Sequence, residues 1–172
     1  RGLGDVYKRQ TKGNTEALVG QALEGAKEVP WPVKTEIFSL AEKTVRPCIG
    51  CEKCLEWRTW CLRRDDDFPE LWQKYMNADA VIFGSPVYVA NVSAQLKAAI
   101  DRLSSSMCSF FWKPEGAGFP RFIKVGAAVA QGQNMFYQGQ DFTCQLIITS
   151  FLLWNHIVVS GDMPLSYIGV PG

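Results

Sequence analysis

Apolar and polar residues alternate along this chain with two different periods. Residues 14–28, NTEALVGQALEGAKE, carry apolar side chains three or four positions apart, which predicts an amphipathic helix that Asn14 or Thr15 can cap. Residues 33–40, VKTEIFSL, alternate residue by residue and predict a strand. Further strands are predicted at 78–86, 122–130 and 156–161, and further helices at 67–78, 91–103 and 141–154.

The helix predicted at 67–78 has a start signal of its own. Asp67 and Glu70 have the spacing of a capping box, and Pro69 suits the first turn. We expect the acidic run Asp65–Asp67 to cap this helix and face the positive end of its dipole, rather than to bind a metal. Residues 104–120, by contrast, predict the longest irregular segment, an excursion over a site.

Because strands and helices alternate, we expect an α/β fold built on a doubly wound parallel sheet. Ligands of such sheets bind beyond the carboxyl ends of the strands. The loops expected at that edge are residues 8–15, 84–93 and 130–140, all rich in Gly, Asn, Ser, Gln or Thr. The sequence therefore predicts a binding site there.

Each of these loops suits one part of a flat, phosphorylated cofactor. Gly13, Asn14 and Thr15 open a helix whose N–H groups can hold a phosphate. Pro86 gives a rigid turn, and a heteroaromatic ring can lie against Tyr88. The amide side chains of residues 130–140 can bind the polar edge of that ring. Taken singly, each loop also fits an ordinary helix cap or a partly buried tyrosine; together they favour a cofactor.

The composition argues against several classes of partner. Hydrophobic residues make up 47% of the 172 positions, charged residues 20%, and the formal net charge is +1, so nothing favours nucleic acid or an anionic membrane. The longest apolar stretch, residues 144–159, is too short and too polar to span a bilayer. With no export signal visible and the cysteines clustered, a reducing cytoplasm is the expected location.

The cysteine cluster occupies residues 48–61, CIGCEKCLEWRTWC. Its four thiols, in the spacing C-x2-C-x2-C-x6-C, belong to Cys48, Cys51, Cys54 and Cys61. Three thiolates this close can hold three corners of a cube while the fourth closes it, which suits a 4Fe–4S cluster. A structural zinc site, reduced unligated thiols and a thiol–disulfide pair stay open as alternatives.

Other reactive side chains receive simpler interpretations. We expect Cys108, in a loop, and Cys144, on a helix, to be packing residues, and His156 to be structural. Without a second histidine, a hydrolytic triad has little support. The cations near the cysteines either dock an acidic electron donor or form a solvated surface; they are Lys53, Arg58, Arg63 and Arg64.

Residues 12–28, the motif CIGCEKC with Cys61, and residues 78–104 together resemble the NAD(P)H-dependent FMN reductase group, and more narrowly its iron–sulfur flavoproteins. The resemblance implies a flavodoxin-like sheet of strand order 2-1-3-4-5. It implies an FMN phosphate at Gly13, Asn14 and Thr15, and a cluster on the four cysteines. It also implies a homodimer with the cysteine loop of one subunit near the flavin of the other. The residues implied to line the isoalloxazine ring and close the site are Ser85, Pro86, Val87, Tyr88, Asn91, Ser93, Gly132, Gln133 and Asn134.

The chain departs from this family at its start. Residues 1–11, RGLGDVYKRQT, stand where the family has an apolar strand, so we expect them to be non-native or truncated. Strand 1 is central in the order 2-1-3-4-5, and it would then be missing or replaced. Residues 12–172 are expected to form a single domain, with the cysteine loop at residues 46–66.

The sequence thus predicts a cytoplasmic oxidoreductase that passes electrons between NAD(P)H or a ferredoxin-type protein donor, a 4Fe–4S cluster, FMN and a small acceptor. No residue is assigned to acid–base catalysis. The first alternative is an NAD(P)H:FMN or quinone reductase without a cluster. A passive electron carrier and a zinc-stapled interaction module are the other two.

Overall fold

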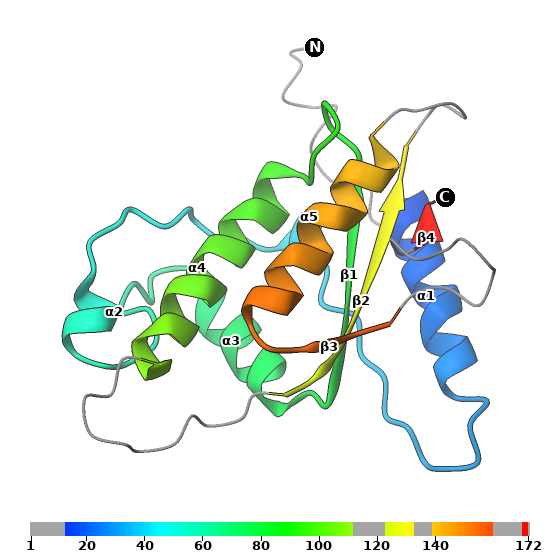
Figure 1. The fold of residues 1–172 in the computed structure, drawn as a ribbon, viewed down its shortest axis with the longest axis horizontal. Helices are drawn as coiled ribbons and strands as arrows, with labels where there is room; N and C mark the ends of the chain where they lie inside the picture. The colour runs from blue at the N-terminus through cyan, green and yellow to red at the C-terminus, as the bar shows by residue number, and fades with distance from the viewer. Residues whose placement is uncertain (1–12, 112–122, 133–138, 160–169, 172) are drawn as a thin grey trace.

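The computed structural model describes residues 13–111, 123–132, 139–159 and 170–171 (Figure 1). Its helices are α1 (Asn14–Ala26), the 3-10 helix η2 (Leu40–Glu42), α2 (Lys53–Glu56), α3 (Phe68–Asn77), α4 (Ala94–Phe111) and α5 (Gln140–Leu153). Its strands are β1 (Ala80–Pro86), β2 (Val125–Gln131), β3 (Ile157–Val158) and β4 (Val170–Pro171). None of the described helices is long and apolar enough to cross a membrane.

The strands form a parallel sheet in which β2 is central. β1 pairs with β2 along its whole length, from Ala80 opposite Val125 to Pro86 opposite Gln131. On its other side β2 pairs with β3 near its start and with β4 near its end. In Figure 1, α3, α4 and α5 lie on one face of the sheet and α1 lies on the other. This arrangement confirms the predicted doubly wound α/β fold.

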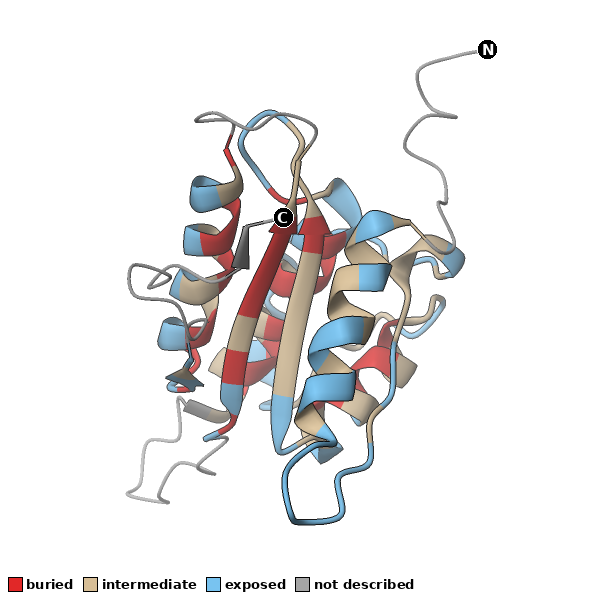
Figure 2. Cartoon of the chain, turned by 90° about the vertical axis from the view of Figure 1, so that its right-hand side faces the viewer, coloured by how far each residue is buried: buried red, intermediate tan, exposed pale blue. Residues whose placement is uncertain are grey.

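The core lies between the sheet and the α3, α4 and α5 layer. Aromatic rings fill much of it; the Phe83 ring of β1, for example, lies 4.9 Å from the Phe151 ring of α5. Leu103 and Met107 on α4 are completely buried. On the opposite face α1 has no buried residue, and Figure 2 draws it in the colours of exposed and intermediate positions. Most of the apolar burial therefore fastens α4 and α5 to the sheet.

Helix α1 nevertheless sits very close to β1. A Cβ placed on Gly84 would lie 2.5 Å from Cγ2 of Val19 and 3.2 Å from Cγ2 of Thr15. Only a glycine permits this approach without a shift of the neighbouring side chains. The contact brings the first turn of α1 to the carboxyl half of β1, as a ligand site at that edge requires.

The strand predicted at residues 33–40 is wrong. Residues 33–39 form no strand, and the 3-10 helix η2 begins at Leu40. Side chains Val33 and Ile37 are 42% and 44% exposed. A strand exists only through pairing, and no described segment pairs with these residues, although their alternation is that of a strand.

Both predicted helix starts differ in detail from the structure. The N-cap of α1 is Gly13, so neither Asn14 nor Thr15 caps the helix. Asp67 is the N-cap of α3 but makes no side-chain cap bond; its carboxylate accepts a hydrogen bond from the backbone N–H of Thr44 at 2.7 Å. Lys43 donates to Glu70 at 2.7 Å, so the predicted capping box does not form. Both carboxylates thus bind groups outside the helix instead of its own backbone N–H groups.

The segment predicted to be irregular, residues 104–120, begins as helix. Helix α4 continues to Phe111, so Cys108 lies on a helix and not in a loop. Residues 112–120 lie outside the described part of the chain. Three successive serines lower helix propensity only slightly, and packing against the core compensates.

A pair of glycine substitutions tests the packing of α1. We expect Gly84→Ala to lower the free energy of unfolding by about 1–3 kcal/mol, because the added methyl group collides with Val19. Gly20→Ala on α1 is the matched control: a Cβ there meets nothing within 4 Å, and alanine should stabilise the helix by about 0.5–1 kcal/mol. Urea unfolding of the two variants measures both effects, and equal effects would contradict this packing.

Candidate functional site

The loop that follows β1 is held in place by buried hydrogen bonds. The hydroxyl of Ser85, which is completely buried, donates to the carbonyl of Pro86 at 2.8 Å and accepts from the backbone N–H of Ser93 at 2.9 Å. The N–H of Val87 donates to the carbonyl of Gln131 at 2.8 Å. The Ser93 hydroxyl accepts from the N–H of Leu96 at 3.2 Å and so caps α4. These side chains thus shape the loop.

The tip of this loop is strained and projects outward. Tyr88 and Asn91 exchange two backbone hydrogen bonds, at 2.9 and 3.1 Å. Between them, Val89 and Ala90 have φ angles of 53° and 57°. A β-branched residue rarely adopts this left-handed conformation, which costs about 1–3 kcal/mol and is found mostly at functional sites. The Val89 side chain is completely exposed.

The loop after β2 touches the loop after β1. A Cβ on Gly139, whose φ is 91°, would lie 2.4 Å from Cα of Ala90. Gly132 lies under the side chain of Gln140, where a Cβ would be 2.9 Å from Nε2. Gln133 and Asn134, also predicted at this site, lie outside the described residues.

The start of α1 completes this edge of the sheet. Its N-cap Gly13 has no side chain to cap the first turn, so the N–H groups at the positive end of the helix receive no bond from an N-cap side chain. The structure therefore brings together the α1 start and the loops after β1 and β2. A helix start for a phosphate beside two loops for a ring fits a phosphorylated flat cofactor.

The cysteine loop forms a second candidate site, packed on α4. A cavity of about 240 Å³ is lined by Cys48, Cys51, Cys54 and Cys61, with Cys108 and Arg102 of α4. Ser105 of α4 lies at its wall: its carbonyl accepts from the Cys54 thiol at 3.6 Å, and its hydroxyl lies 3.6 Å from Sγ of Cys48. The structure thus brings all four predicted ligands together, and adds a fifth thiol that the sequence interpretation placed in a loop.

Left-handed residues let the chain fold tightly around this cavity. Gly50, Glu52 and Arg58 have φ angles of 64°, 56° and 49°. The N–H of Gly50 donates to Sγ of Cys48 at 3.5 Å, so a backbone amide approaches one of the sulfurs. Trp60 stacks on Trp72 in the core, at 6.2 Å between ring centroids.

The spacing of the thiols bears on the kind of metal group. In the described part of the chain, no three His, Cys, Asp or Glu side chains are close enough to hold one metal ion. Zinc–sulfur bonds of about 2.3 Å would bring the ligand sulfurs within about 4 Å of one another. Four thiolates are a donor set that both structural zinc sites and 4Fe–4S clusters use, and a cluster holds its ligand sulfurs further apart than a single zinc ion does.

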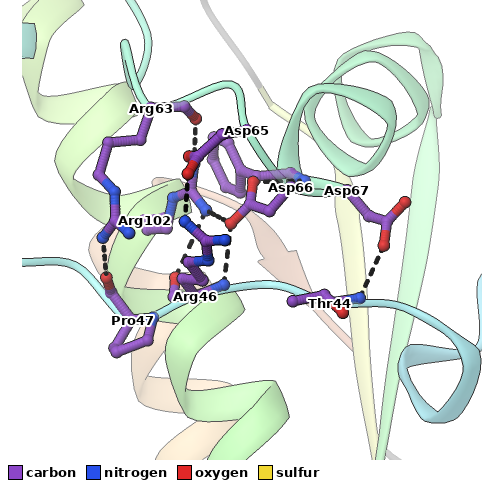
Figure 3. Close-up of polar contacts among 9 residues, drawn as sticks. Thr44, Arg46, Pro47, Arg63, Asp65, Asp66, Asp67 and Arg102 are labelled. Carbon is purple, nitrogen blue, oxygen red and sulfur yellow. Dashed lines mark hydrogen bonds and ion pairs between the residues drawn. The ribbon is translucent and has the colours of Figure 1, made fainter.

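The two ends of the cysteine loop are joined through Arg102 (Figure 3). Its guanidinium forms a completely buried ion pair with Asp66. The same group donates to the carbonyl of Arg63 at 2.5 Å and to the carbonyl of Arg46 at 3.4 Å. Arg63 in turn donates to the carbonyl of Pro47 at 3.0 Å. Residues just before the first cysteine and just after the last are therefore held side by side.

The acidic run Asp65–Asp67 also helps to hold the two ends of the cysteine loop together. Asp66 also accepts from the N–H of Arg46 at 2.9 Å and from that of Phe68 at 3.1 Å, while Asp65 pairs with the Arg46 side chain. Of the run expected to cap α3, only Asp66 has a side chain that bonds the start of that helix; Asp67 does so through its backbone carbonyl, which accepts from the N–H of Leu71 at 3.2 Å. Arg102 was missed by the sequence interpretation, although a charge three residues after Ala99, on the apolar face of α4, was a signal.

The remaining candidates have structural surroundings. His156 is buried and its Nε2 hydrogen-bonds the hydroxyl of Tyr75. Burial lowers the pKa of His156, with the nearby Lys124 acting in the same direction, so both favour the neutral imidazole. Cys144 is buried on α5, and burial raises its pKa to about 11. Both residues therefore match the structural roles expected from the sequence.

Comparison with known proteins decides the family. The profile of the family described as NADPH-dependent FMN reductase matches residues 8–159. The chain belongs to this family. An iron–sulfur flavoprotein of Methanocaldococcus jannaschii is 40% identical over 170 residues, which cover 99% of this chain and 81% of that protein. An iron–sulfur flavoprotein of Methanosarcina thermophila is 36% identical over 152 residues, which cover 87% of this chain and 71% of that protein.

Solved structures agree on the fold. A flavone reductase superposes with a TM-score of 0.65 at 20% identity, over 88% of this chain and 49% of that one. RosB superposes with a TM-score of 0.60 at 14% identity, over 88% of this chain and 57% of RosB. The chain thus spans about half the length of these two proteins. The flavodoxin-like fold, the family and the oxidoreductase class are confirmed: the chain is an FMN-dependent oxidoreductase.

The buried thiol of Cys54 predicts a pH dependence. Burial raises the pKa of Cys54 above its ordinary value, and the Cys61 and Cys48 thiols nearby add to the rise. In metal-free protein, we expect alkylation of Cys54 by iodoacetamide to have its midpoint at higher pH than in urea-unfolded protein, as followed by mass spectrometry. Since metals bind thiolates, loading of the loop should improve as pH rises.

The sign of the linked stability effect follows. Because the pKa of the Cys54 thiol is higher in the folded protein than in the unfolded protein, this thiol stabilises the fold while it is protonated. That contribution is complete below the unfolded value of about 8.5 and is lost as pH rises through the folded value. Equal alkylation midpoints in folded and unfolded protein would contradict the burial of Cys54.

Proposed function

We propose that this oxidoreductase carries FMN at the carboxyl edge of its sheet and a 4Fe–4S cluster in the cysteine cavity. The observation that carries the proposal is the convergence of Cys48, Cys51, Cys54 and Cys61 on one cavity. The names of the curated relatives, which are iron–sulfur flavoproteins, support it. When bound, FMN exchanges two electrons with NAD(P)H and single electrons with an iron–sulfur cluster.

The residues of the chain would bind and orient these groups. Gly13, Asn14 and Thr15 at the start of α1 would hold the FMN phosphate through backbone N–H groups and the Thr15 hydroxyl. The loop 85–93 would lie along the flavin ring, shaped by the Ser85 and Ser93 hydrogen bonds. Gly132 and the residues after it would close the site. On the side of the buried Cys54, the wall formed by α4 would cover the cluster, whereas Cys48 and Cys51 lie at exposed positions.

The distance between the two sites favours a homodimer. Ser93 caps the start of α4, whereas the cysteines pack on Ser105 and Ser106, twelve and thirteen positions further on. At about 1.5 Å per residue, these points lie about 18 Å apart along the helix. Single-electron transfer through protein falls steeply with distance, so a second subunit that brings its cysteine loop to this flavin would shorten the path. The proposed partners are thus a second copy, and a small-molecule or protein electron donor and acceptor.

Cofactor content tests this proposal directly. In protein purified without oxygen, we expect about one FMN and four irons per chain, with flavin bands above a broad iron–sulfur absorbance. The variant Cys51→Ser should lose most of the iron and keep the FMN, because only the cysteine cavity is changed. Cys144→Ser is the matched control and should keep both groups, since that thiol lies on α5 and outside the cavity.

Each alternative function predicts a different result. FMN without iron would favour a reductase that lacks a cluster. Zinc without FMN would favour an interaction module. Both cofactors with no NAD(P)H oxidation, when quinone or ferricyanide is supplied as acceptor, would favour a passive carrier. Either of the first two results in the intact protein would overturn the proposed pair of cofactors, and the third would overturn NAD(P)H as the electron donor.

A further inference from the structure

Arg102 is a completely buried charge beside the cysteine cavity and is held on several sides. The side chain is completely buried, and its Nη1 and Nη2 atoms bond Asp66 and the backbone carbonyls of Arg46 and Arg63. Its Cζ lies 4.0 Å from the centroid of the Phe68 ring, which fixes the plane of the guanidinium. Such contacts leave the group little freedom to turn.

One nitrogen of this side chain has no partner. Nε of Arg102 is buried and has no hydrogen-bond partner among the described residues, whereas Nη1 and Nη2 are both bonded. A buried donor without an acceptor is costly, so the unpaired Nε–H calls for an explanation. Arg102 itself lines the cavity that the cysteines surround. If the cavity holds an iron–sulfur cluster, as the proposed function requires, the sulfur atoms of that cluster are the hydrogen-bond acceptors that it adds.

We propose that the Nε–H of Arg102 donates a hydrogen bond to a sulfur of the iron–sulfur group in this cavity. The inference rests on the proposed function, since it needs the cluster. A sulfur acceptor becomes more negative when the cluster takes up an electron, so the bond strengthens on reduction. Hydrogen bonds to the sulfurs and nearby charge both set the reduction potential of such clusters. Arg102 is therefore a positioning residue that also raises the potential of the cluster.

The test is a redox titration of the cluster, followed by electron paramagnetic resonance of the whole, loaded protein. Arg102→Lys keeps a positive charge opposite Asp66 but has no Nε–H. We expect the ratio of reduced to oxidised cluster at a fixed potential to fall about tenfold, which is about 59 mV for a one-electron couple. Lys97→Met is the matched control: it removes a cation from the same helix, where the pair with Asp101 is exposed, and should leave the ratio unchanged.

A second variant separates this role from a purely structural one. Asp66→Asn weakens the same closure of the loop but leaves the Nε–H in place and removes a negative charge. We expect the reduced fraction to stay at the wild-type value or to rise. If Arg102 only held the loop, both variants would lower the reduced fraction, and this result would overturn the inference. The inference would also be overturned if Arg102→Lys titrated at the same potential as the wild-type protein.

The two proposals fail in different ways. A wild-type protein without any iron–sulfur signal would overturn the proposed cluster and this inference with it. A wild-type protein with a normal cluster, whose titration is unchanged in Arg102→Lys, would overturn this inference alone. Should Arg102→Lys not fold, the direction of the Asp66→Asn shift decides, and a lowered reduced fraction counts against the inference.

Discussion

The hydrogen-bonded backbone of α4 fixes the separation between the two candidate sites. Its first turn is capped by Ser93 at the end of the β1 loop, and its later turns carry the serines against which the cysteine loop packs. Completely buried residues such as Leu103 hold the helix on the sheet. Because a packed helix cannot shorten, one subunit keeps its predicted flavin site and its cysteine cavity at opposite ends of the same rod.

The cysteine loop adds a second constraint, an ion pair buried beneath it. Removing one partner of such a pair typically costs about 3–5 kcal/mol, because the other charge is left unpaired. Arg102 and Asp66 therefore make loop closure a condition of a stable fold rather than a consequence of metal binding. A loop closed in advance reduces the entropy lost when a cluster binds. The same side chain lines the cavity, so the proposed tuning of a cluster would be coupled to closure of the loop.

The sequence predicts what depends on local periodicity. The strands β1 and β2, the helices α4 and α5 and the polar loops at the carboxyl edge all follow from patterns of a few residues. The strand expected at residues 33–40 does not form, because strand pairing depends on residues elsewhere in the chain. The capping box does not form, because Thr44 donates to the carboxylate of Asp67 and Lys43 donates to that of Glu70. Arg102 was hidden for the same reason: its partners are 36 to 56 residues away along the chain.

We propose that four cysteines seat a four-iron cluster in this FMN-dependent oxidoreductase. The Mössbauer spectrum of protein labelled with iron-57 and prepared without oxygen measures the state of that iron. We expect the signal to arise from tetrahedral, sulfur-coordinated iron with delocalised valence, at four irons per chain. A spectrum without such iron, in protein that retains its FMN, would contradict it.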